Sequence, residues 1–302
     1  HSQGEYVFDH GWADAWSRAG GQYYPKLLMA VPFTPVPGPR LLADDETVAR
    51  GLIAAAEAIV ARHGLSSAHA TFLESRDIER FRAAGWLIRE GTQFHWINAG
   101  YAGFDDFLAS LSSRKRKAIR KERATAQAGL EIVGLTGAAI AEAHWDAFWQ
   151  FYQDTGARKW GRPYLTRAFF SLLGQAMADK VLLVLALRDG QPIAGALNLI
   201  GADALYGRYW GCSEEVPCLH FELCYYQAID FAIAHGLGRV EAGAQGEHKL
   251  ARGYGPVPTW SAHYIADRGF RAAVADFVER ERRAVDNEIA FLGEMTPFRK
   301  SS

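Results

Sequence analysis

Sulfur is scarce in this chain of 302 residues, which has three methionines and three cysteines. Cys212, Cys218 and Cys224 are odd in number and too few for a disulfide framework. Their six-residue spacing matches no zinc motif. We therefore expect reduced thiols without a chemical role, and no metal site.

Long apolar runs are also missing. The longest, residues 181–187, has seven residues and ends at Arg188, whereas a bilayer span needs about 18. No charged and apolar leader precedes His1. We therefore expect a cytoplasmic chain without a membrane span.

Neither charge sign dominates, since 33 Lys and Arg residues face 34 Asp and Glu residues and the net charge is −1. This balance excludes a chain-wide basic field for nucleic acid. One local exception is residues 114–123, RKRKAIRKER, with seven basic residues and one acidic residue. It predicts a local site for an anion, such as a diphosphate or a tRNA backbone. The alternative is a solvated charged helix, although such helices usually mix the two signs.

The composition, 49% hydrophobic and 22% charged, is globular, and the length suits two domains or one large one. The periodicity predicts an α/β fold with a mixed α+β sheet. Its clearest signal is an antiparallel meander of strands at 181–188, 192–200 and 205–212. A helix at 219–235 and a strand at 239–244 follow, and a helical crossover makes that strand parallel to the third meander strand. The basic stretch forms a helix at 113–128.

The two halves of the chain also resemble each other. Residues 63–65 match 235–237 with an offset of 172, and residues 93–97 match 261–265 with an offset of 168. Gly85-Trp86 matches Gly253-Tyr254 with the second offset, so the repeat needs a four-residue indel. The order helix, strand, loop or short helix, strand is the same in both halves. It predicts two related α/β lobes.

Several motifs resemble a known family. The order strand-strand-strand-helix-strand-helix is that of the GNAT acyltransferase core. Three stretches resemble Fem-type transferases: SSRKRKAIRKERATAQAGLEI, LHFELCYYQAIDFAIAHGLGRVEAGAQG and HKLARGYG. The closest resemblance, spanning the chain, is to the FemAB-like branch of GNAT proteins, labelled peptidoglycan biosynthesis or recognition, and it is carried by YYPKL, PFTPVPG, QFHW, YGRYWGC, LHFELCYY and GAQGEHKLARG.

This resemblance implies tandem GNAT-like lobes, the first at 1–110 and N-terminally incomplete, the second at 111–302 with the basic helix. It implies transfer of an acyl or aminoacyl group to an amine, with a peptidoglycan precursor as one acceptor. The donor would be acyl-CoA or aminoacyl-tRNA, and no cofactor would be bound permanently. The alternatives are a non-catalytic protein that binds an anionic precursor and an RNA-binding module. The oligomeric state stays open.

Candidate site residues gather in the second half of the chain. The loop 243–255 combines glycines with polar side chains that suit a phosphate or carboxylate; its alternative is a solvated turn. Lys249 lies in the segment that resembles the Fem lysine segment. The expected catalytic residues are Lys249, His220, His248 and Glu222, and the expected substrate-binding residues are Arg208, Trp210, Gln245, Glu247, Arg252, Arg116 and Arg120.

Two of these expectations have structural alternatives. Arg208 and Trp210 are placed on one face of a strand, where a buried Arg needs an anionic partner or belongs to an aromatic core with an ion pair. His220 and Glu222 open a helix on different faces, and a glutamate there is favoured by the helix dipole alone. We expect His220, Glu247, His248, Lys249, Arg252 and Arg208 to converge on one cleft, because they sit at one edge of a strand-helix-strand unit.

Overall fold

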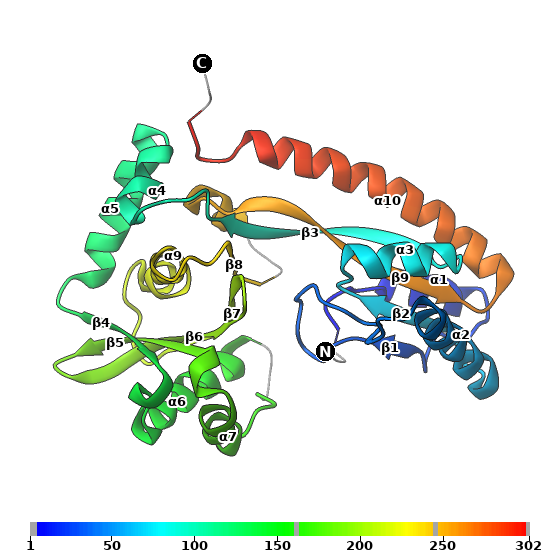
Figure 1. The fold of residues 1–302 in the computed structure, drawn as a ribbon, viewed down its shortest axis with the longest axis horizontal. Helices are drawn as coiled ribbons and strands as arrows, with labels where there is room; N and C mark the ends of the chain where they lie inside the picture. Colours follow the sequence, from blue (N-terminus) through cyan, green and yellow to red (C-terminus); the bar gives the residue numbers. More distant parts are fainter. Residues whose placement is uncertain (1–4, 160–162, 244–246, 300–302) are drawn as a thin grey trace. The chain divides into compact units, whose positions relative to one another are not determined.

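The computed structural model describes residues 5–159, 163–243 and 247–299 (Figure 1). Its contacts group into two compact units, residues 1–93 with 256–294 and residues 94–255 with 295–302. The sequence prediction instead divides the chain at residue 110. Because the units interleave along the chain, a simple cut at one residue does not separate them, and the assignment of each unit to one GNAT-like lobe stays a prediction.

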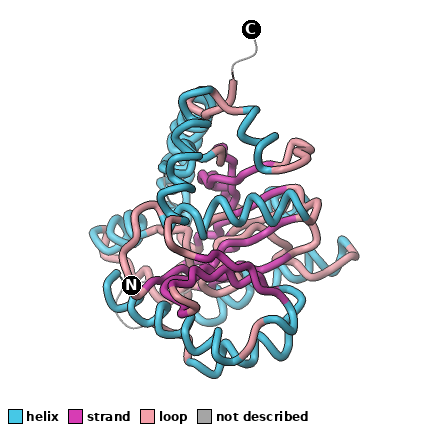
Figure 2. The backbone as a smooth tube through the Cα atoms, turned by 90° about the vertical axis from the view of Figure 1, so that its left-hand side faces the viewer, coloured by secondary structure: helices cyan, strands magenta, loops and turns pink. Residues whose placement is uncertain are grey.

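The strands form a mixed sheet, so the predicted mixed α/β fold is confirmed. The strand order is β1-β2-β9-β3-β8-β7-β6-β5-β4, with parallel pairs β1/β2 and β7/β8 among antiparallel ones. Helices border the strands (Figure 2). The strand bounds are β1 Leu27–Met29, β2 Ser67–Thr71, β3 Leu87–Ile97, β4 Glu131–Thr136, β5 Val181–Arg188, β6 Gln191–Ile200, β7 Ala204–Cys212, β8 Arg239–Glu241 and β9 Gly255–Ile265.

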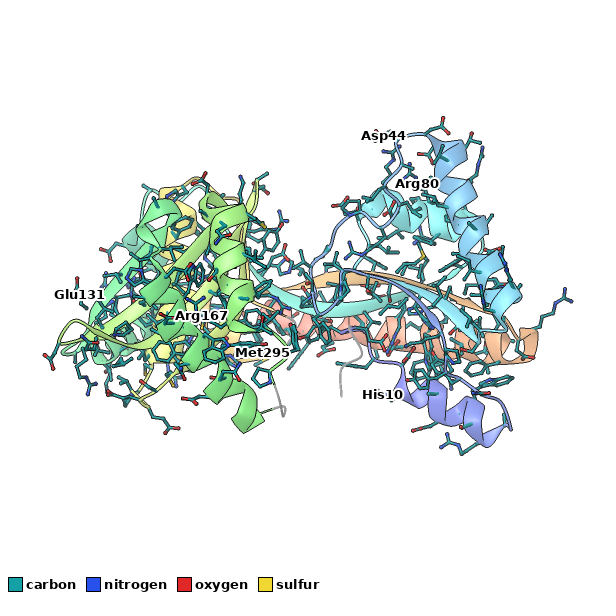
Figure 3. All side chains as sticks on the ribbon, turned by 90° about the horizontal axis from the view of Figure 1, so that it is seen from below. His10, Asp44, Arg80, Glu131, Arg167 and Met295 are labelled. Carbon is teal, nitrogen blue, oxygen red and sulfur yellow. The ribbon has the colours of Figure 1, made fainter. Side chains whose placement is uncertain are left out.

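The first unit packs helices α1 His10–Arg18, α2 Glu46–His63, α3 Ser75–Ala83 and α10 Arg268–Glu294 around β1, β2 and most of β9. Asp45 begins α2 by accepting hydrogen bonds from the backbone of residues 47 and 48. The inner face of α2, with Ile53 and Val60, packs on Phe81 of α3 and on the strand β2. Arg80 of α3 ties this helix to the start of α2 near Asp44 through the carboxylate of Glu46 (Figure 3).

The second unit contains the predicted meander as β5, β6 and β7, all antiparallel. Strand β5 is buried over residues 181–186, as its continuous apolar run predicts. Helices α6 Glu142–Lys159 and α7 Arg167–Met177 cover one face (Figure 1), with Phe148 and Phe170 packed on Leu183. The other helical elements of this unit are α4 Phe104–Ser110, α5 Ser113–Gln127, η1 Gly137–Ala139, η2 Ala178–Lys180, α8 Leu219–Phe221, the π turn η3 Glu222–Tyr226, α9 Gln227–Ala234 and η4 Glu247–Arg252.

The two units exchange one strand each. Strand β9, from the second half of the sequence, pairs with β2 in the first unit, whereas residues 95–97 of β3, from the first half, pair with β8 in the second unit. The registers of these two strand pairs agree with the sequence repeat. His69 lies opposite His263 in the β2/β9 pair, and Glu241 lies opposite His95 in the β3/β8 pair. Residues 69 and 241 differ by 172, and residues 95 and 263 by 168, the two offsets found in the sequence. The register therefore supports a real internal duplication.

Candidate functional site

The candidate site begins where the parallel strands β7 and β8 part. Their ladder has three rungs and ends at Tyr206 opposite Glu241, which confirms the predicted parallel pairing. Strand β7 continues to Cys212, whereas β8 ends at Glu241 instead of the predicted residue 244. In the described part of the chain, the ladder between β7 and β8 therefore does not extend along residues 209–211. Peptide groups on such an edge are available to a ligand chain.

A β-bulge lies on the same stretch of β7. Leu197 of β6 pairs with Tyr209, but the next residue, Asn198, pairs with Gly207, so Arg208 is the extra residue. The bulge turns Arg208 toward the segment before α7. Its guanidinium donates to the hydroxyl of Tyr164 at 3.0 Å and lies 4.5 Å from the ring centre of Tyr209. The expected convergence of Arg208 with His220 and His248 stays a prediction.

The predicted helix 219–235 is interrupted. The π turn η3 separates α8 from α9, and such a turn inserts one residue and so rotates the following positions by about 100° relative to a regular α-helix. The neighbouring tyrosines Tyr225 and Tyr226 point to different partners. The hydroxyl of Tyr225 shares a hydrogen bond of 2.8 Å with Nε2 of His248, and the hydroxyl of Tyr226 donates to Glu122 of α5.

Three of the expected site residues come together as an aromatic cluster. The ring of His220 lies 5.3 Å from that of Trp210 and 6.4 Å from that of His248, measured between ring centres. Tyr225 completes the cluster at 5.4 Å from His220. These residues come from β7, α8, η3 and η4, elements that meet at the parting of β7 and β8. Burial lowers the pKa of His248, so this imidazole is mainly neutral near pH 7.

A pocket of about 420 Å³ adjoins the cluster. Trp210 and His220 form part of its wall, and the remaining lining comes from Cys212, Leu219 and the segment 214–217. Glu214 at its rim pairs with Arg188 at 2.9 Å. The pocket thus presents an imidazole and an indole together, a lining that suits a small organic group better than a bare anion.

Lys249 is buried rather than exposed to a cleft. Its side chain is 2% exposed, and Nζ donates a 2.7 Å hydrogen bond to the carbonyl oxygen of Gly243. Burial lowers the pKa of this lysine to about 8. A lysine with such a pKa exchanges its proton near neutral pH, which a solvated lysine does not.

Two expected site residues belong to ion pairs that hold the unit together. Glu222 is 0% exposed and accepts hydrogen bonds from Arg123 and Gln127 of α5 and from Gln227 of α9. Arg252 pairs with Glu122 of α5 at 2.9 Å and stacks on the ring of Phe221 at 3.4 Å. Both side chains therefore bind α5 to the candidate site, and the structure does not bring Glu222 into the aromatic cluster.

The predicted basic helix is confirmed as α5, and its two faces differ. The inner face carries Glu122, Arg123 and Gln127, which make the contacts just described. The outer face carries exposed cations. Arg120 pairs with Asp105, with 58% and 88% of the two side chains exposed, and Arg116 makes a 3.4 Å contact with Ser113. The expected substrate-binding role of Arg116 and Arg120 stays a prediction.

Two expected residues cannot be placed, since Gln245 and the side chain of Glu247 lie outside the described residues. Within the described residues, no three His, Cys, Asp or Glu side chains are arranged to hold a metal ion. Over the same residues, no helix is both long and apolar enough to cross a membrane.

Sequence reasoning missed one buried pair beside the site, His95 of β3 and Glu241 of β8. They are 8% and 4% exposed, and Nε2 of His95 lies 3.7 Å from Oε2 of Glu241. Burial lowers the pKa of His95 to about 4 and raises the pKa of Glu241. The sequence repeat could have revealed this pair. With the offset of 172, His69 corresponds to Glu241, and with the offset of 168, His95 corresponds to His263.

The sequence matches the model of the FemAB-like family, described as peptidoglycan biosynthesis/recognition, over residues 1–300. The chain therefore belongs to the FemAB-like family. No curated protein matches the sequence.

Solved structures of related fold include three informative cases. The C-terminal domain of a putative lysylphosphatidylglycerol synthetase from Agrobacterium fabrum superposes with a TM-score of 0.58 at 11% identity, covering 78% of this chain and 77% of that one. L-PGS from Bacillus licheniformis gives 0.53 at 11% identity, over 84% and 79% of the chains. FemX gives 0.52 at 12% identity, over 83% and 82%. At such identities the similarity shows the fold alone.

Proposed function

We propose that this FemAB-like protein is a transferase that moves an acyl or aminoacyl group onto an amine, with an amine-bearing peptidoglycan precursor as acceptor. The observation that carries the proposal is the parting of β7 and β8 next to His220, His248 and Lys249. Acyl transfer needs a polarised carbonyl, a deprotonated amine and a stabilised leaving group. Each requirement has a candidate at this place.

The edge of β7 beyond the end of its ladder with β8 is the candidate for polarising the carbonyl. Backbone N–H groups at residues 209–211 can bind an extended donor chain and its carbonyl oxygen there. Fixed backbone donors need no reorganisation during the reaction. In the step, the amine nitrogen forms a bond to the acyl carbon, and the bond from that carbon to the donor oxygen or sulfur breaks.

Lys249 and His248 are the candidates for handling protons. With a pKa of about 8, the Lys249 ammonium can give its proton to the departing alkoxide or thiolate and recover it from water. His248, held by the hydroxyl of Tyr225, is neutral and can accept a proton. Both residues lie on η4, so one short element positions them together.

The outer face of α5 favours aminoacyl-tRNA over acyl-CoA as the donor. Among the described residues, the cations on this face form no ion pair with the residues of the candidate site. They are arranged along the helix, and a nucleic acid backbone likewise presents its phosphates along a line. The test is donor consumption. The protein is incubated with radiolabelled alanyl-tRNA or acetyl-CoA and a UDP-linked muropeptide, and the acid-stable amide product is identified by mass spectrometry. We expect transfer from alanyl-tRNA.

Replacing Arg116, Lys117, Arg120 and Lys121 by Ala tests the role of α5. We expect tRNA affinity to fall by about 10-fold or more at low salt, with a smaller loss at high salt because the lost interaction is electrostatic. Replacing Arg280, Arg282 and Arg283, which are exposed on α10, is the control and should change affinity little. Equal losses in both variants would leave α5 as a merely solvated helix.

A non-catalytic binding protein for an anionic precursor or RNA is the second candidate. One observation favours it: Lys249 and Arg252 are buried and committed to internal contacts. In this case the protein would bind alanyl-tRNA or the muropeptide, as measured by calorimetry, while neither donor is consumed over hours.

A further inference from the structure

Glu241 occupies a distinctive place in the second unit. It forms the last rung of the β7/β8 ladder, so its carboxylate stands at the point where the two strands part. Its Oε1 accepts a 2.8 Å hydrogen bond from Arg239. Its Oε2 is buried and accepts no hydrogen bond from the described residues. A buried carboxylate oxygen without a partner is costly, and in native proteins it calls for a functional explanation.

The imidazole of His95 lies close to this oxygen. The separation of 3.7 Å between Nε2 and Oε2 is too long for a hydrogen bond. The imidazole therefore leaves the acceptor capacity of Oε2 unused. The charged groups around the pair are Arg239, which holds Oε1, and Lys249, whose charge acts on His95. No cation among the described residues is hydrogen-bonded to Oε2.

The equivalent pair in the first unit differs on this point. His69 and His263 meet through Nδ1 atoms 2.6 Å apart, and their Nε2 atoms bond the hydroxyls of Ser67 and Ser261 at 2.7 and 2.8 Å. All four ring nitrogens are thus satisfied. The duplication placed a titratable pair at the same register in both units, and of the two pairs only the second contains a carboxylate with an unbonded oxygen. Beside the first pair, Oδ1 of Asp9 is also unbonded, but Oδ2 of Asp9 already accepts bonds from Tyr23 and Lys26.

We propose that Oε2 of Glu241 binds the ammonium group of the acceptor and takes its proton, with His95 as the adjacent proton-accepting group. This inference rests on the proposed function and names the chemistry of its acceptor, a primary amine that arrives as an ammonium ion. A primary ammonium is a small donor of three hydrogen bonds, and it fits a covered carboxylate better than a bulky or quaternary cation does.

The step balances as follows. The acceptor ammonium gives one proton to the Glu241 carboxylate, which becomes a neutral carboxylic acid. The freed amine attacks the acyl carbon, the new C–N bond forms, and the bond to the donor oxygen or sulfur breaks. The second proton leaves the nitrogen for His95, the leaving group takes a proton from Lys249, and solvent restores all three residues. A carboxyl group whose pKa is raised by burial is suited to this task.

The first test needs no donor. The probe is methylammonium chloride at pH 7, and the readout is the ¹⁵N spectrum of the histidine-labelled protein, with His95 assigned by its loss in His95→Gln. We expect methylammonium to shift the His95 signals, and tetramethylammonium at equal concentration to leave them unchanged. In Glu241→Gln, which keeps the shape and an oxygen for Arg239, the shift should vanish. Glu131→Gln, at an exposed position on β4 (Figure 3), is the control.

The second test separates base catalysis from structure. Transfer from alanyl-tRNA to methylamine, an ammonium ion at pH 7, is compared with transfer to hydroxylamine, which is already neutral. Glu241→Gln should slow transfer to methylamine by about 100-fold or more and leave transfer to hydroxylamine nearly unchanged, because only the first nucleophile needs a base. A merely structural role would slow both reactions equally.

These outcomes separate the two proposals. Methylammonium binding that depends on Glu241, without any donor consumption, would support the amine site and remove the transferase. Two results would overturn the role of Glu241 while leaving the transferase proposal intact. One is donor consumption with His95 signals that methylammonium does not shift. The other is an equal loss of transfer rate with the two nucleophiles in Glu241→Gln. Glu241→Asp, which keeps the charge but withdraws the carboxylate from the amine, provides the same comparison if Glu241→Gln fails to fold.

Discussion

The two exchanged strand pairs have the same register but opposite chemistry. In the first unit, His69 and His263 close a hydrogen-bonded chain with two serines, and both rings are 1% exposed. In the second unit, Glu241 and His95 stand 3.7 Å apart with one carboxylate oxygen unbonded. The difference shows how a duplicated fold can use one position for packing in one copy and keep it reactive in the other.

The surroundings of the two pairs also differ, although Oδ1 of Asp9 beside the first pair is likewise buried without a hydrogen-bond partner in the described residues. Tyr23, Asp9 and Lys26 extend the first chain, with Tyr23 donating to Asp9 at 2.5 Å and Lys26 donating to it at 2.7 Å. This network ends in an internal ion pair with Glu5. The second pair instead adjoins the parted strands β7 and β8, where a ligand chain has backbone groups to bind.

Replacing Lys249 tests the reactive side of the comparison and should have the largest effect. We expect Lys249→Met to cut turnover by about 10²-fold or more, because the leaving group loses its proton donor. The carbonyl of Gly243 also loses its hydrogen bond, so the free energy of unfolding should fall by roughly 1–3 kcal/mol. Single-turnover kinetics and urea unfolding measure the two effects. Lys180→Met, at an exposed position, is the control.

If Lys249→Met keeps its turnover, the lysine is a structural residue of η4, and the second unit is no more reactive than the first.

Parallel substitutions in the two pairs should separate stability from activity. His263→Leu leaves Nδ1 of His69 and the hydroxyl of Ser261 without partners, and we expect a loss of roughly 2–4 kcal/mol in unfolding free energy with the kinetics of the folded fraction unchanged. Glu241→Gln should change the unfolding free energy by less than about 1 kcal/mol, since the bond from Arg239 persists. Reversed results would show that the first unit holds the reactive pair.

The meander, the basic helix and the repeat could be predicted from the sequence because they depend on local periodicity, turns and spacing. The strand exchange could not be predicted, because the pairing of β9 with β2 and of β3 with β8 is a choice among sequence-distant strands with similar patterns. The sequence placed Glu222 and His220 on different faces, but the pairing of Glu222 with α5 depends on tertiary packing, which local periodicity does not give. Lys249 was found by its segment, but its burial comes from the packing of η4.

Acid should destabilise the protein mainly through its buried imidazoles. Burial lowers the pKa of His69 to about 3 and that of His95 to about 4, and it lowers the pKa of His263 well below its usual value. A folded-state pKa below the unfolded value of about 6.5 favours the folded state while the ring is neutral. This contribution is complete above pH 6.5 and is lost as the pH falls toward 4 and 3.

The groups that face the first pair are Asp9, Lys26, Arg89 and Tyr23. Asp9, whose pKa is lowered, acts in the same direction at still lower pH. We therefore expect the melting temperature to fall steadily below pH 6.5, and His263→Leu and His95→Gln each to flatten this dependence, because each removes one buried ring from titration. A melting temperature that is constant from pH 7 to 4 would contradict the buried neutral rings.

The smallest expected effect concerns what the two copies still share. Gly64 and Gly236 end the equivalent helices α2 and α9 in the left-handed region, with φ of 62° and 65°. A Cβ at either position would meet no atom within 4 Å, so Gly→Ala adds only backbone strain. Gly64→Ala and Gly236→Ala should each lower the unfolding free energy by about 1 kcal/mol. Urea unfolding of both variants measures this, and the two losses should agree within error, since the duplicated scaffold imposes the same turn on both copies. Unequal losses would mean that the divergence between the units extends from the titratable pairs into the backbone that carries them.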